Sequence, residues 1–545
     1  MFFHHWASQA LLFASTALAS TTSSTDISPI HIASNKFFDE AGTQFFIKGI
    51  AYQRQMPGYE NQPFPEIQKG YIDSLAHPEK CLPDIELLKE LNVNTIRVYQ
   101  IDPDQSHETC MHALARNGIY VLVDLSEPKH AINRNDPSWH TELFQHFQAV
   151  IDNMHRYDNV LGFIAGNEVV TSSSDASAAA YVKAAIRDSK AYQRQKGYRQ
   201  IPIGYTANDD EETRKEALQY FQCPSNSTDS VADFYGINMF EWCGYSTFAT
   251  SGFRARTREF SQSAVPVFLS EFGCNSVRPR PFTETESLYG PEMAGVWSGG
   301  VAYEFFENEN HYGLVFEEKT GRLQKSAEFD TLRLRFTAAR PPRAENTAWG
   351  GKKTAPVCPK WPVSADLPGT PNDEICGCLG ELVTCKPKSE PSEFDSPELS
   401  KENQALFKKV CEVVDCSAVT GDGGSGKYGQ FSGCAPVTRL AWALSKAEAD
   451  GVECDFGGKA ERLGGVRGSE KCKGIDFFGK RKGESREGGS STVASTSVSV
   501  SSGESISQPL ARQVNSTNGT KVGFHLNGAQ KVAPSSWWGL FLMVL

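Results

Sequence analysis

The sequence predicts an α/β fold: a (β/α)8 TIM barrel followed by a small, mainly helical, disulfide-rich module. Three observations predict it. Eight short apolar runs recur between residues 45 and 306, helix-patterned stretches lie between them, and eight of the fourteen cysteines cluster after residue 370. Near-continuous apolar runs are typical of strands buried on both faces, as in a parallel sheet. Eight such strands with intervening helices over roughly 260 residues match the size of a (β/α)8 barrel.

The apolar runs have the length of strands, and polar or helix-patterned stretches separate them. They cover residues 45–52, 95–99, 120–125, 160–169, 201–207, 234–242, 266–273 and 300–306. Helical patterns fall between them, for example over 83–91 and 142–156. A doubly wound open sheet is the alternative fold, but no Gly-rich phosphate loop follows the first run. The barrel is therefore the preferred prediction.

Composition divides the chain into six segments. At 545 residues it exceeds one typical domain, so two folded units with tails are expected. An apolar run that leads to Ala17-Leu18-Ala19 predicts a secretory signal peptide. A Ser- and Gly-rich stretch predicts a stalk without a packed core. The predicted segments are a signal peptide (1–19), the barrel (20–336), a linker (337–370), the cysteine-rich module (371–480), the stalk (481–524) and an attachment signal (525–545).

The two ends of the chain predict a secreted protein that stays at the cell surface. The last residues, SSWWGLFLMVL, follow a polar stretch with small residues at 527–529, a pattern that resembles a GPI-attachment signal. This run is too short to span a bilayer as a helix. We therefore expect a lipid anchor in the outer leaflet of the plasma membrane. N-glycosylation is expected at the sequons of Asn226, Asn515 and Asn518.

Charge and cysteine content narrow the class of protein. A net charge of −11 and a pI near 5.7 argue against nucleic acid as a main partner. Fourteen cysteines in an exported chain predict disulfide bonds. Zinc is the alternative raised by Cys376-Gly377-Cys378, but no paired Cys-x-x-Cys sites and no histidines at zinc-finger spacing accompany this motif. We therefore expect disulfide bonds and no metal.

Two glutamates end apolar runs of the predicted barrel. Glu168, directly after Asn167, closes the fourth run, and Glu271 closes the seventh. The active sites of such barrels lie at the carboxyl ends of the strands. Retaining glycosidases need two carboxyl groups about 5–5.5 Å apart, one to protonate the leaving oxygen and one to attack the sugar. We predict that Glu168 is the acid/base and Glu271 the nucleophile; the alternative for each is an ordinary salt-bridge partner.

Polar and aromatic residues at the same ends of the runs fit a sugar site. Amides and carboxylates bind sugar hydroxyls, and aromatic faces stack on sugar C–H surfaces. The alternative, packing of the barrel top, applies most to Trp242 and Tyr303. The candidate sugar-contacting residues are Gln53, Tyr99, Asp124, Asn167, Trp242 and Tyr303.

Several motifs together resemble one known family. They are FFIKGIAYQ, NTIRVYQIDP, VLVDLSEP, INRNDPSW, GNEV, GINMFEWCG, SEFGCN, RPFTE and LYGPEMAGVWSGG. On these motifs the chain resembles the fungal cell-wall β-1,3-glucanosyltransferases of glycoside hydrolase family 72, from about Asn35 to the end of the cysteine-rich module. The module itself resembles the eight-cysteine X8, or family 43, carbohydrate-binding module.

The resemblance implies a retaining transglycosylation in two steps, without a metal or organic cofactor. A β-1,3-glucan donor is cleaved internally, and the glycosyl part held by the enzyme passes to the non-reducing end of an acceptor glucan, which becomes longer. Glu168 matches the acid/base of the family and Glu271 its nucleophile. The residues that fall at sugar-contacting positions of the family are Gln53, Tyr99, Asp124, Asn167 and Tyr303.

The resemblance also implies three disulfide bonds and reveals two departures. The implied pairs are Cys81 with Cys110, Cys223 with Cys358, and Cys243 with Cys274. Relatives usually carry Tyr where this chain has Phe240, and loss of that hydroxyl is expected to lower the rate or to weaken transfer relative to hydrolysis. The module keeps Trp442 but lacks the Asn and paired Tyr of relatives, so a structural role competes with glucan binding.

Two other functions stay open at this point. A hydrolytic endo-β-1,3-glucanase would share every catalytic residue but would release its products to water. A catalytically weak wall-binding mannoprotein would keep the fold without the activity. Phe240 and the altered module are the two features that raise this alternative.

Overall fold

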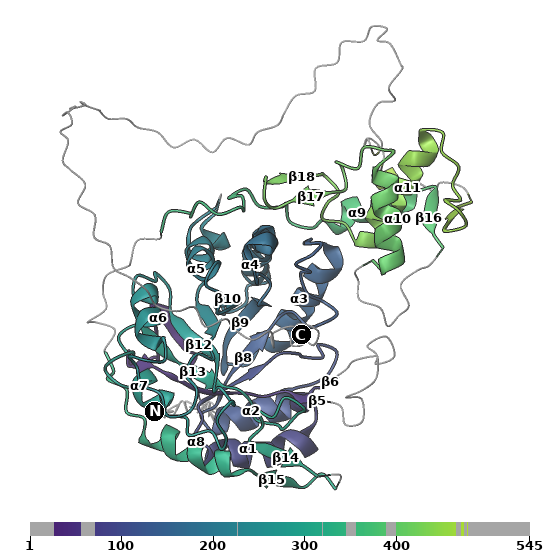
Figure 1. Cartoon of the computed structure of the whole chain (residues 1–545). Coiled ribbons are helices and arrows are strands. Elements are labelled where there is room, and N and C mark those ends of the chain that lie inside the picture. The colour runs from purple at the N-terminus through teal and green to yellow at the C-terminus, as the bar shows by residue number, and fades with distance from the viewer. Residues whose placement is uncertain are drawn as a thin grey trace, which may run out of the picture. The chain divides into compact units, whose positions relative to one another are not determined.

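A closed barrel of eight parallel strands forms the centre of the computed structural model (Figure 1). The structure describes residues 27–55, 71–225, 227–318, 320–344, 356–388, 399–464, 470–472 and 477. The strands follow the order β10-β11-β12-β13-β4-β7-β8-β9 around the barrel. They are β4 (Ile47–Ala51), β7 (Thr95–Val98), β8 (Tyr120–Asp124), β9 (Val160–Asn167), β10 (Ile203–Asn208), β11 (Tyr235–Asn238), β12 (Val267–Phe272) and β13 (Trp297–Ala302). The predicted (β/α)8 barrel is confirmed.

A helix follows each barrel strand along the chain. The eight helices are α1 (Pro78–Glu90), α2 (Glu108–Arg116), α3 (Thr141–Met154), α4 (Ala179–Lys196), α5 (Arg214–Gln222), α6 (Phe253–Phe260), α7 (Glu284–Leu288) and α8 (Ala327–Ala338). Short 3-10 turns and hairpins extend the connections: η2 (Ser74–Ala76), η3 (Ser173–Ala178), η4 (Thr228–Ser230), β5 (Arg54–Gln55) with β6 (Tyr71–Ile72), and β14 (Val315–Glu317) with β15 (Leu323–Lys325). The eighth strand begins at Trp297, before the predicted run, because Ser298 and the glycines beside it interrupt the apolar pattern.

Phe234 fills the inside of the barrel near the amino-terminal ends of the strands. A Cβ added at Gly162 would lie 2.6 Å from its ring, and one at Gly204 2.3 Å, so only glycine leaves room for it. A small sheet of β1 (His31–Ala33), β2 (Lys36–Phe38) and β3 (Gln44–Phe45) covers this end. Phe37 of that sheet packs 6.3 Å from Phe234 and 6.4 Å from Phe268, between ring centroids. The carboxyl ends of the strands are therefore the end at which a site can form.

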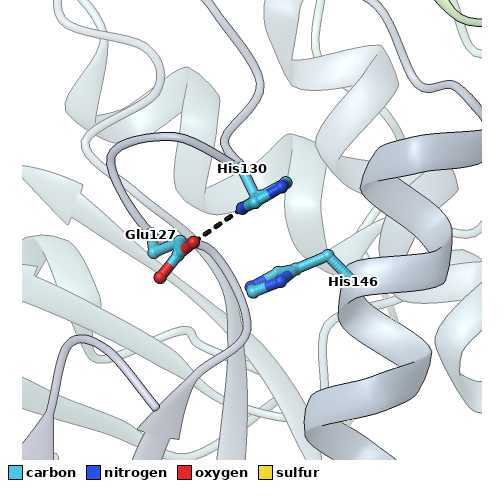
Figure 2. A group of neighbouring side chains, drawn as sticks. All are labelled: Glu127, His130 and His146. Atoms are coloured by element: carbon cyan, nitrogen blue, oxygen red, sulfur yellow. Dashed lines mark hydrogen bonds and ion pairs between the residues drawn. The ribbon is translucent and has the colours of Figure 1, made fainter. Parts of the chain in front are cut away.

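The loop between β8 and α3 carries charged residues that contact both α3 and the residue after β9. Glu127 and His130 face each other across a β-bridge, with 2.6 Å between Oε1 and Nδ1, and the His130 ring stacks on that of His146 from α3 (Figure 2). Further along the loop, Arg134 donates to the backbone carbonyl of Glu168 at 2.7 Å. This loop therefore lies beside the carboxyl end of β9.

The cysteine-rich module is built from short elements joined by four disulfide bonds. The elements are α9 (Asp373–Leu382), β16 (Cys385–Pro387), α10 (Lys401–Cys411), β17 (Gly421–Asp422), β18 (Lys427–Tyr428), α11 (Pro436–Ala449), β19 (Ala460–Arg462) and η6 (Glu470–Cys472). The bonds join Cys376 to Cys434, Cys378 to Cys472, Cys385 to Cys454, and Cys411 to Cys416. Since Cys376 and Cys378 are both in disulfides, the zinc alternative is excluded. The predicted mainly helical, disulfide-rich module is confirmed.

Trp442 is part of the interior of this module. Only 2% of its surface is exposed, and its indole Nε1 donates to the backbone carbonyl of Phe477 at 2.6 Å. The ring therefore stabilises the module and does not offer a face for stacking on a sugar.

Three more disulfide bonds hold the barrel and the residues that follow it. They join Cys81 to Cys110, Cys223 to Cys358, and Cys243 to Cys274, which are the pairs that the resemblance implies. The predicted segments 1–19, 481–524 and 525–545 and the predicted glycosylation sites Asn226, Asn515 and Asn518 lie outside the described residues. Within the described residues, none of the helices combines the length and hydropathy needed to cross a membrane.

Candidate active site

Glu168 directly follows β9 in a backbone conformation that is uncommon for a residue other than glycine. Its φ is 49°, in the left-handed region; this conformation costs of order 1–3 kcal/mol and persists only where surrounding contacts hold it. Its amide donates to the carbonyl of Thr206 at 2.9 Å, and Arg134 donates to its carbonyl at 2.7 Å. Asn238 Nδ2 donates to its side-chain Oε1 at 2.8 Å. Both the backbone and the carboxyl group of Glu168 are therefore fixed at the barrel rim.

Glu271 lies within β12 and is almost completely buried, with 6% of its surface exposed. Its Oε1 accepts a hydrogen bond from the Tyr99 hydroxyl at 2.8 Å and pairs with Arg97 at 3.4 Å. Burial raises the pKa of the Glu271 carboxyl to about 8, and the charge of Glu168 adds to this, although Arg97 and the Tyr99 hydroxyl act in the opposite direction. These two donors stabilise the carboxylate form, which is the form that can attack a sugar.

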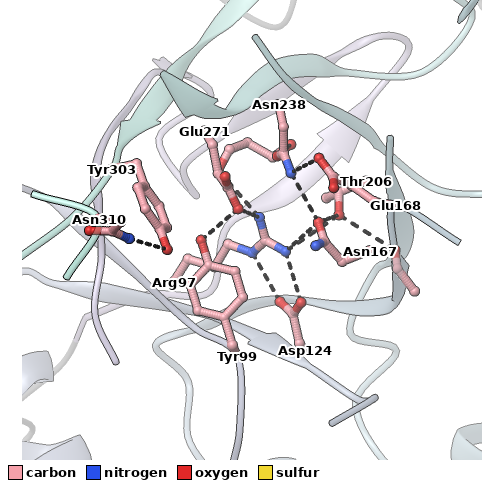
Figure 3. A network of polar contacts seen from close by, with 12 residues as sticks. Arg97, Tyr99, Asp124, Asn167, Glu168, Thr206, Asn238, Glu271, Tyr303 and Asn310 are labelled. Carbon is pink, nitrogen blue, oxygen red and sulfur yellow. Dashed lines mark hydrogen bonds and ion pairs between the residues drawn. The ribbon is translucent and has the colours of Figure 1, made fainter. Parts of the chain in front are cut away.

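Arg97 is the centre of a buried network that joins five strands (Figure 3). The residue is fully buried, and its guanidinium binds both carboxylate oxygens of Asp124, at 3.0 and 2.8 Å. It also donates to Asn167 Oδ1 at 3.0 Å and lies 4.3 Å from the Tyr99 ring centroid. A buried charge needs such partners, because leaving it unpaired costs several kcal/mol. The sequence interpretation missed Arg97, although a charge inside the apolar run TIRVY was a signal for it.

Asn238 is a neighbour of both glutamates. It lies opposite Glu271 in the register of β11 and β12, and its side chain donates to Glu168, which follows β9, two strands away. Its Oδ1 accepts from the Ser270 hydroxyl at 2.8 Å, which fixes the orientation of the amide. Figure 3 shows the side chains of Glu168 and Glu271 on either side of Asn238 and Arg97. The two carboxyl groups therefore lie in the same polar network, and the charge of Glu168 raises the pKa of Glu271. Asn238 was not among the predicted site residues.

Three of the predicted sugar-contacting residues belong to this network. Asp124 is 3% exposed and uses both oxygens for Arg97, and Tyr99 uses its hydroxyl for Glu271. Asn167 Oδ1 accepts from Arg97 and, at 2.6 Å, from the Thr206 hydroxyl. The amide NH2 of Asn167 is the group of this residue that could donate to a sugar. In the structure the Asp124 carboxylate pairs with Arg97 and the Tyr99 hydroxyl binds Glu271, so both residues act on the charge around Glu271.

The other three predicted residues lie around the same rim. Tyr303 follows β13; its ring is 6.3 Å from that of Phe240, and its hydroxyl accepts from Asn310 at 3.5 Å. The Gln53 side chain, after β4, donates to the carbonyl of Ile72 at 3.4 Å. Trp242 is 5% exposed and bonds to Thr283, so packing, the alternative stated for it, is what the structure shows.

Aromatic rings form a wall beside Glu271. The rings of Phe240, Tyr303 and Tyr312 lie 5.3–6.3 Å apart, centroid to centroid, in edge-to-face arrangements. Aromatic faces of this kind suit the C–H surfaces of a sugar. With two carboxyl groups, the polar network around Arg97 and an aromatic wall, the barrel mouth has the groups that glycosyl transfer requires.

Comparison with known proteins places this architecture in a family. A family model described as glucanosyltransferase, of glycoside hydrolase family 72, matches residues 19–340, and an X8 domain model matches residues 394–461. The chain belongs to the glucanosyltransferase family. The prediction made from the motifs is therefore confirmed for both the barrel and the module.

Members of the glucanosyltransferase family align over most of the chain. The 1,3-beta-glucanosyltransferase PGA5 of Candida albicans is 45% identical over 465 residues, which cover 80% of this chain and 71% of the relative. The 1,3-beta-glucanosyltransferase GAS2 of Saccharomyces cerevisiae is 46% identical and covers 76% of each chain. A solved structure of Gas2p from that yeast in complex with laminaritriose and laminaritetraose has a TM-score of 0.72 at 43% identity, and the match covers 80% of this chain and 97% of that chain.

Proposed function

We propose that this glucanosyltransferase remodels β-1,3-glucan by retaining transglycosylation, with Glu168 as acid/base and Glu271 as nucleophile. The observation that carries the proposal is the pair of glutamates at the ends of β9 and β12, with Asn238 bonded to Glu168 and Arg97 paired with Glu271. Two relatives are named 1,3-beta-glucanosyltransferases, and Gas2p was solved with laminari-oligosaccharides. These names support a β-1,3-glucan as donor and as acceptor.

In the first step the glycosidic bond of the donor is broken. The Glu271 carboxylate attacks the anomeric carbon while the Glu168 carboxyl gives its proton to the leaving glycosidic oxygen. One fragment of the glucan departs, and the other stays on Glu271 as an ester. Arg97 and Tyr99 contact the oxygen Oε1 of Glu271 and stabilise its negative charge before the attack.

In the second step the roles of Glu168 reverse. Its carboxylate now removes a proton from the hydroxyl at the non-reducing end of an acceptor glucan, and that oxygen attacks the anomeric carbon and releases Glu271. Two inversions give net retention, and the acceptor is elongated by a new β-1,3 bond. A bound acceptor competes well with water because its hydroxyl is held next to the ester.

Hydrolysis is the second candidate function, and Phe240 favours it. The ring of Phe240 lies in the aromatic wall, 5.7 Å from Tyr312, without the hydroxyl that relatives usually carry at this position. A missing donor or acceptor there would weaken the hold on an acceptor sugar and let water take its place.

A reduced laminari-oligosaccharide distinguishes transfer from hydrolysis. Incubation with the purified chain is expected to give products longer than the substrate, whereas shorter products alone would indicate a glucanase. Glu168→Gln and Glu271→Gln should each abolish turnover, while the control Glu86→Gln, on the exposed face of α1, should not. Near-normal activity of either active-site variant would overturn the assignment of roles.

We further propose that the enzyme works at the cell surface, tethered through a GPI anchor. The predicted signal peptide and the short apolar C-terminal run support this proposal. Seven disulfide bonds, which use all fourteen cysteines, are typical of an oxidising compartment outside the cytosol. Release of the protein from membranes by a phosphatidylinositol-specific phospholipase would support the anchor, and retention after that treatment would contradict it.

A further inference from the structure

Three side chains of types that bind metals lie close together at the loop that follows β8, outside the network around Arg97. Glu127 and His130 come from the loop, and His146 comes from the second turn of α3 (Figure 2). One ligand atom from each lies within 4.8 Å of the ligand atoms of the other two. Within the part of the chain that the structure describes, this is the one group of at least three such residues with that spacing.

We propose that Glu127, His130 and His146 form a binding site for a divalent transition-metal ion, for which Zn²⁺ is the best suited. Two imidazoles and one carboxylate are a donor set that Zn²⁺ takes, with a fourth position left for water. Harder ions such as Mg²⁺ and Ca²⁺ prefer sites made of oxygen ligands, so this set discriminates against them.

Two contacts behind the ligands resemble the outer shell of a metal site. The backbone carbonyl of Leu125 lies against the His146 ring, in the place of an outer-shell carbonyl. The Tyr71 hydroxyl donates to Glu127 Oε2 at 3.0 Å and leaves Oε1 on the side of the histidines. Histidines that bind metals almost always donate their second ring nitrogen to a carbonyl or carboxylate, and ligating carboxylates are themselves hydrogen-bonded.

The arrangement needs a small closure to hold an ion. Zn–N bonds of about 2.0–2.1 Å place tetrahedral ligands roughly 3.3 Å apart. In the structure the rings of His130 and His146 are stacked with 4.3 Å between centroids and 9° between planes, so one ring must turn. His130 is the one with freedom to turn, because it lies on the loop with 31% of its side chain exposed. Its 2.6 Å contact with Glu127 would be replaced by two bonds to the ion.

A simple histidine–glutamate ion pair is the competing explanation, and the chain contains a matched example. His311 and Glu307 form such a pair, with 2.9 Å between Nδ1 and Oε1, in another exposed loop. That pair has no third ligand among the described residues within the same spacing. His311→Ala is therefore a control that removes a comparable histidine without touching the proposed site.

Isothermal titration of the untagged, full, disulfide-bonded chain with ZnCl2 after treatment with EDTA tests the proposal. We expect one ion per chain in the wild type and in His311→Ala. Changes to residues behind the metal ligands typically lower metal affinity by about 10–100-fold. His130→Ala and His146→Ala remove ligands and should each lower the affinity for Zn²⁺ by more than that. All fourteen cysteines are in disulfides, so no thiolate competes for the ion.

Cobalt provides a second measurement that does not depend on glucan activity. Co²⁺ in a four-coordinate site with nitrogen ligands absorbs strongly in the visible range, and this band should be present in the wild type and absent in His130→Ala. His130→Gln and Glu127→Gln, checked by circular dichroism in EDTA, replace any alanine variant that does not fold. Failure of the wild type to bind Zn²⁺, or unchanged binding by the folded variants, would overturn the proposal.

Discussion

Removal of the Tyr99 hydroxyl tests how far this residue favours the ionised form of the buried Glu271 carboxyl. Tyr99 donates to Glu271 Oε1 at 2.8 Å, and this contact lowers the pKa of a carboxyl group that burial raises. Tyr99→Phe removes the donor and keeps the ring beside Arg97. Since the charged form of Glu271 loses a stabilising partner, the pKa of Glu271 rises further.

The size of the effect follows from the kind of hydrogen bond. A hydrogen bond to a charged group contributes about 1.5–3 kcal/mol, and 1.36 kcal/mol corresponds to one pKa unit, so the pKa should rise by about 1–2 units. Because the nucleophile must be ionised, activity is present above this pKa and is lost as the pH falls through it. The acid limb of kcat/KM should therefore move to higher pH by about 1–2 units, and the rate below it should fall about 10–100-fold.

The assay is the pH profile of kcat/KM for a laminari-oligosaccharide, measured for the wild type and for two variants. The matched control is Tyr120→Phe, which removes a hydroxyl that donates to the carbonyl of Ser28 near the amino-terminal end of the barrel. Its profile should match that of the wild type. An acid limb of Tyr99→Phe that stays in place or moves to lower pH would refute this account of the Glu271 environment.

Three further predictions concern other parts of the barrel. Arg134→Ala removes the side chain that donates to the backbone carbonyl of Glu168 at 2.7 Å, where the backbone is strained. Steady-state kinetics should show kcat falling about tenfold or more with little change in KM, and Arg134→Lys should restore part of the loss. A fall in stability with normal kcat would contradict this role. Phe240→Tyr should raise the ratio of transfer to hydrolysis products in chromatography of the reaction, and an unchanged ratio would remove Phe240 from the acceptor site. Glu328→Gln breaks a buried ion pair with Arg280, in which the two atoms lie 2.6 Å apart. The free energy of unfolding, measured by denaturant titration, should fall by about 3–5 kcal/mol. A loss below about 1 kcal/mol would show that the pair contributes little to stability.

The barrel and its two glutamates could be predicted because their physical signals are local. A parallel strand buried on both faces gives an uninterrupted apolar run, as in β8, and the carboxyl end of each run locates the barrel mouth. Glu168 and Glu271 are acids at such ends, and no knowledge of distant residues was needed to select them.

The network around the glutamates could not be predicted, because its partners lie far apart in sequence. Asp124 was predicted to contact sugar, yet Arg97 occupies both of its oxygens, and that pairing depends on how β7 and β8 align. The eight cysteines of the module allow 105 pairings from sequence alone, so their connectivity needed the fold. The cluster of Glu127, His130 and His146 likewise exists only because the loop folds back on α3.

A covalent trapping experiment tests the central claim, attack by Glu271 with proton transfer by Glu168, most directly. A laminari-oligosaccharyl donor with fluorine at C2 and a good leaving group should form a long-lived ester, and peptide mass spectrometry should locate the added sugar on Glu271 and on no other residue. A label on another residue, or an active enzyme that never carries the label, would contradict the mechanism.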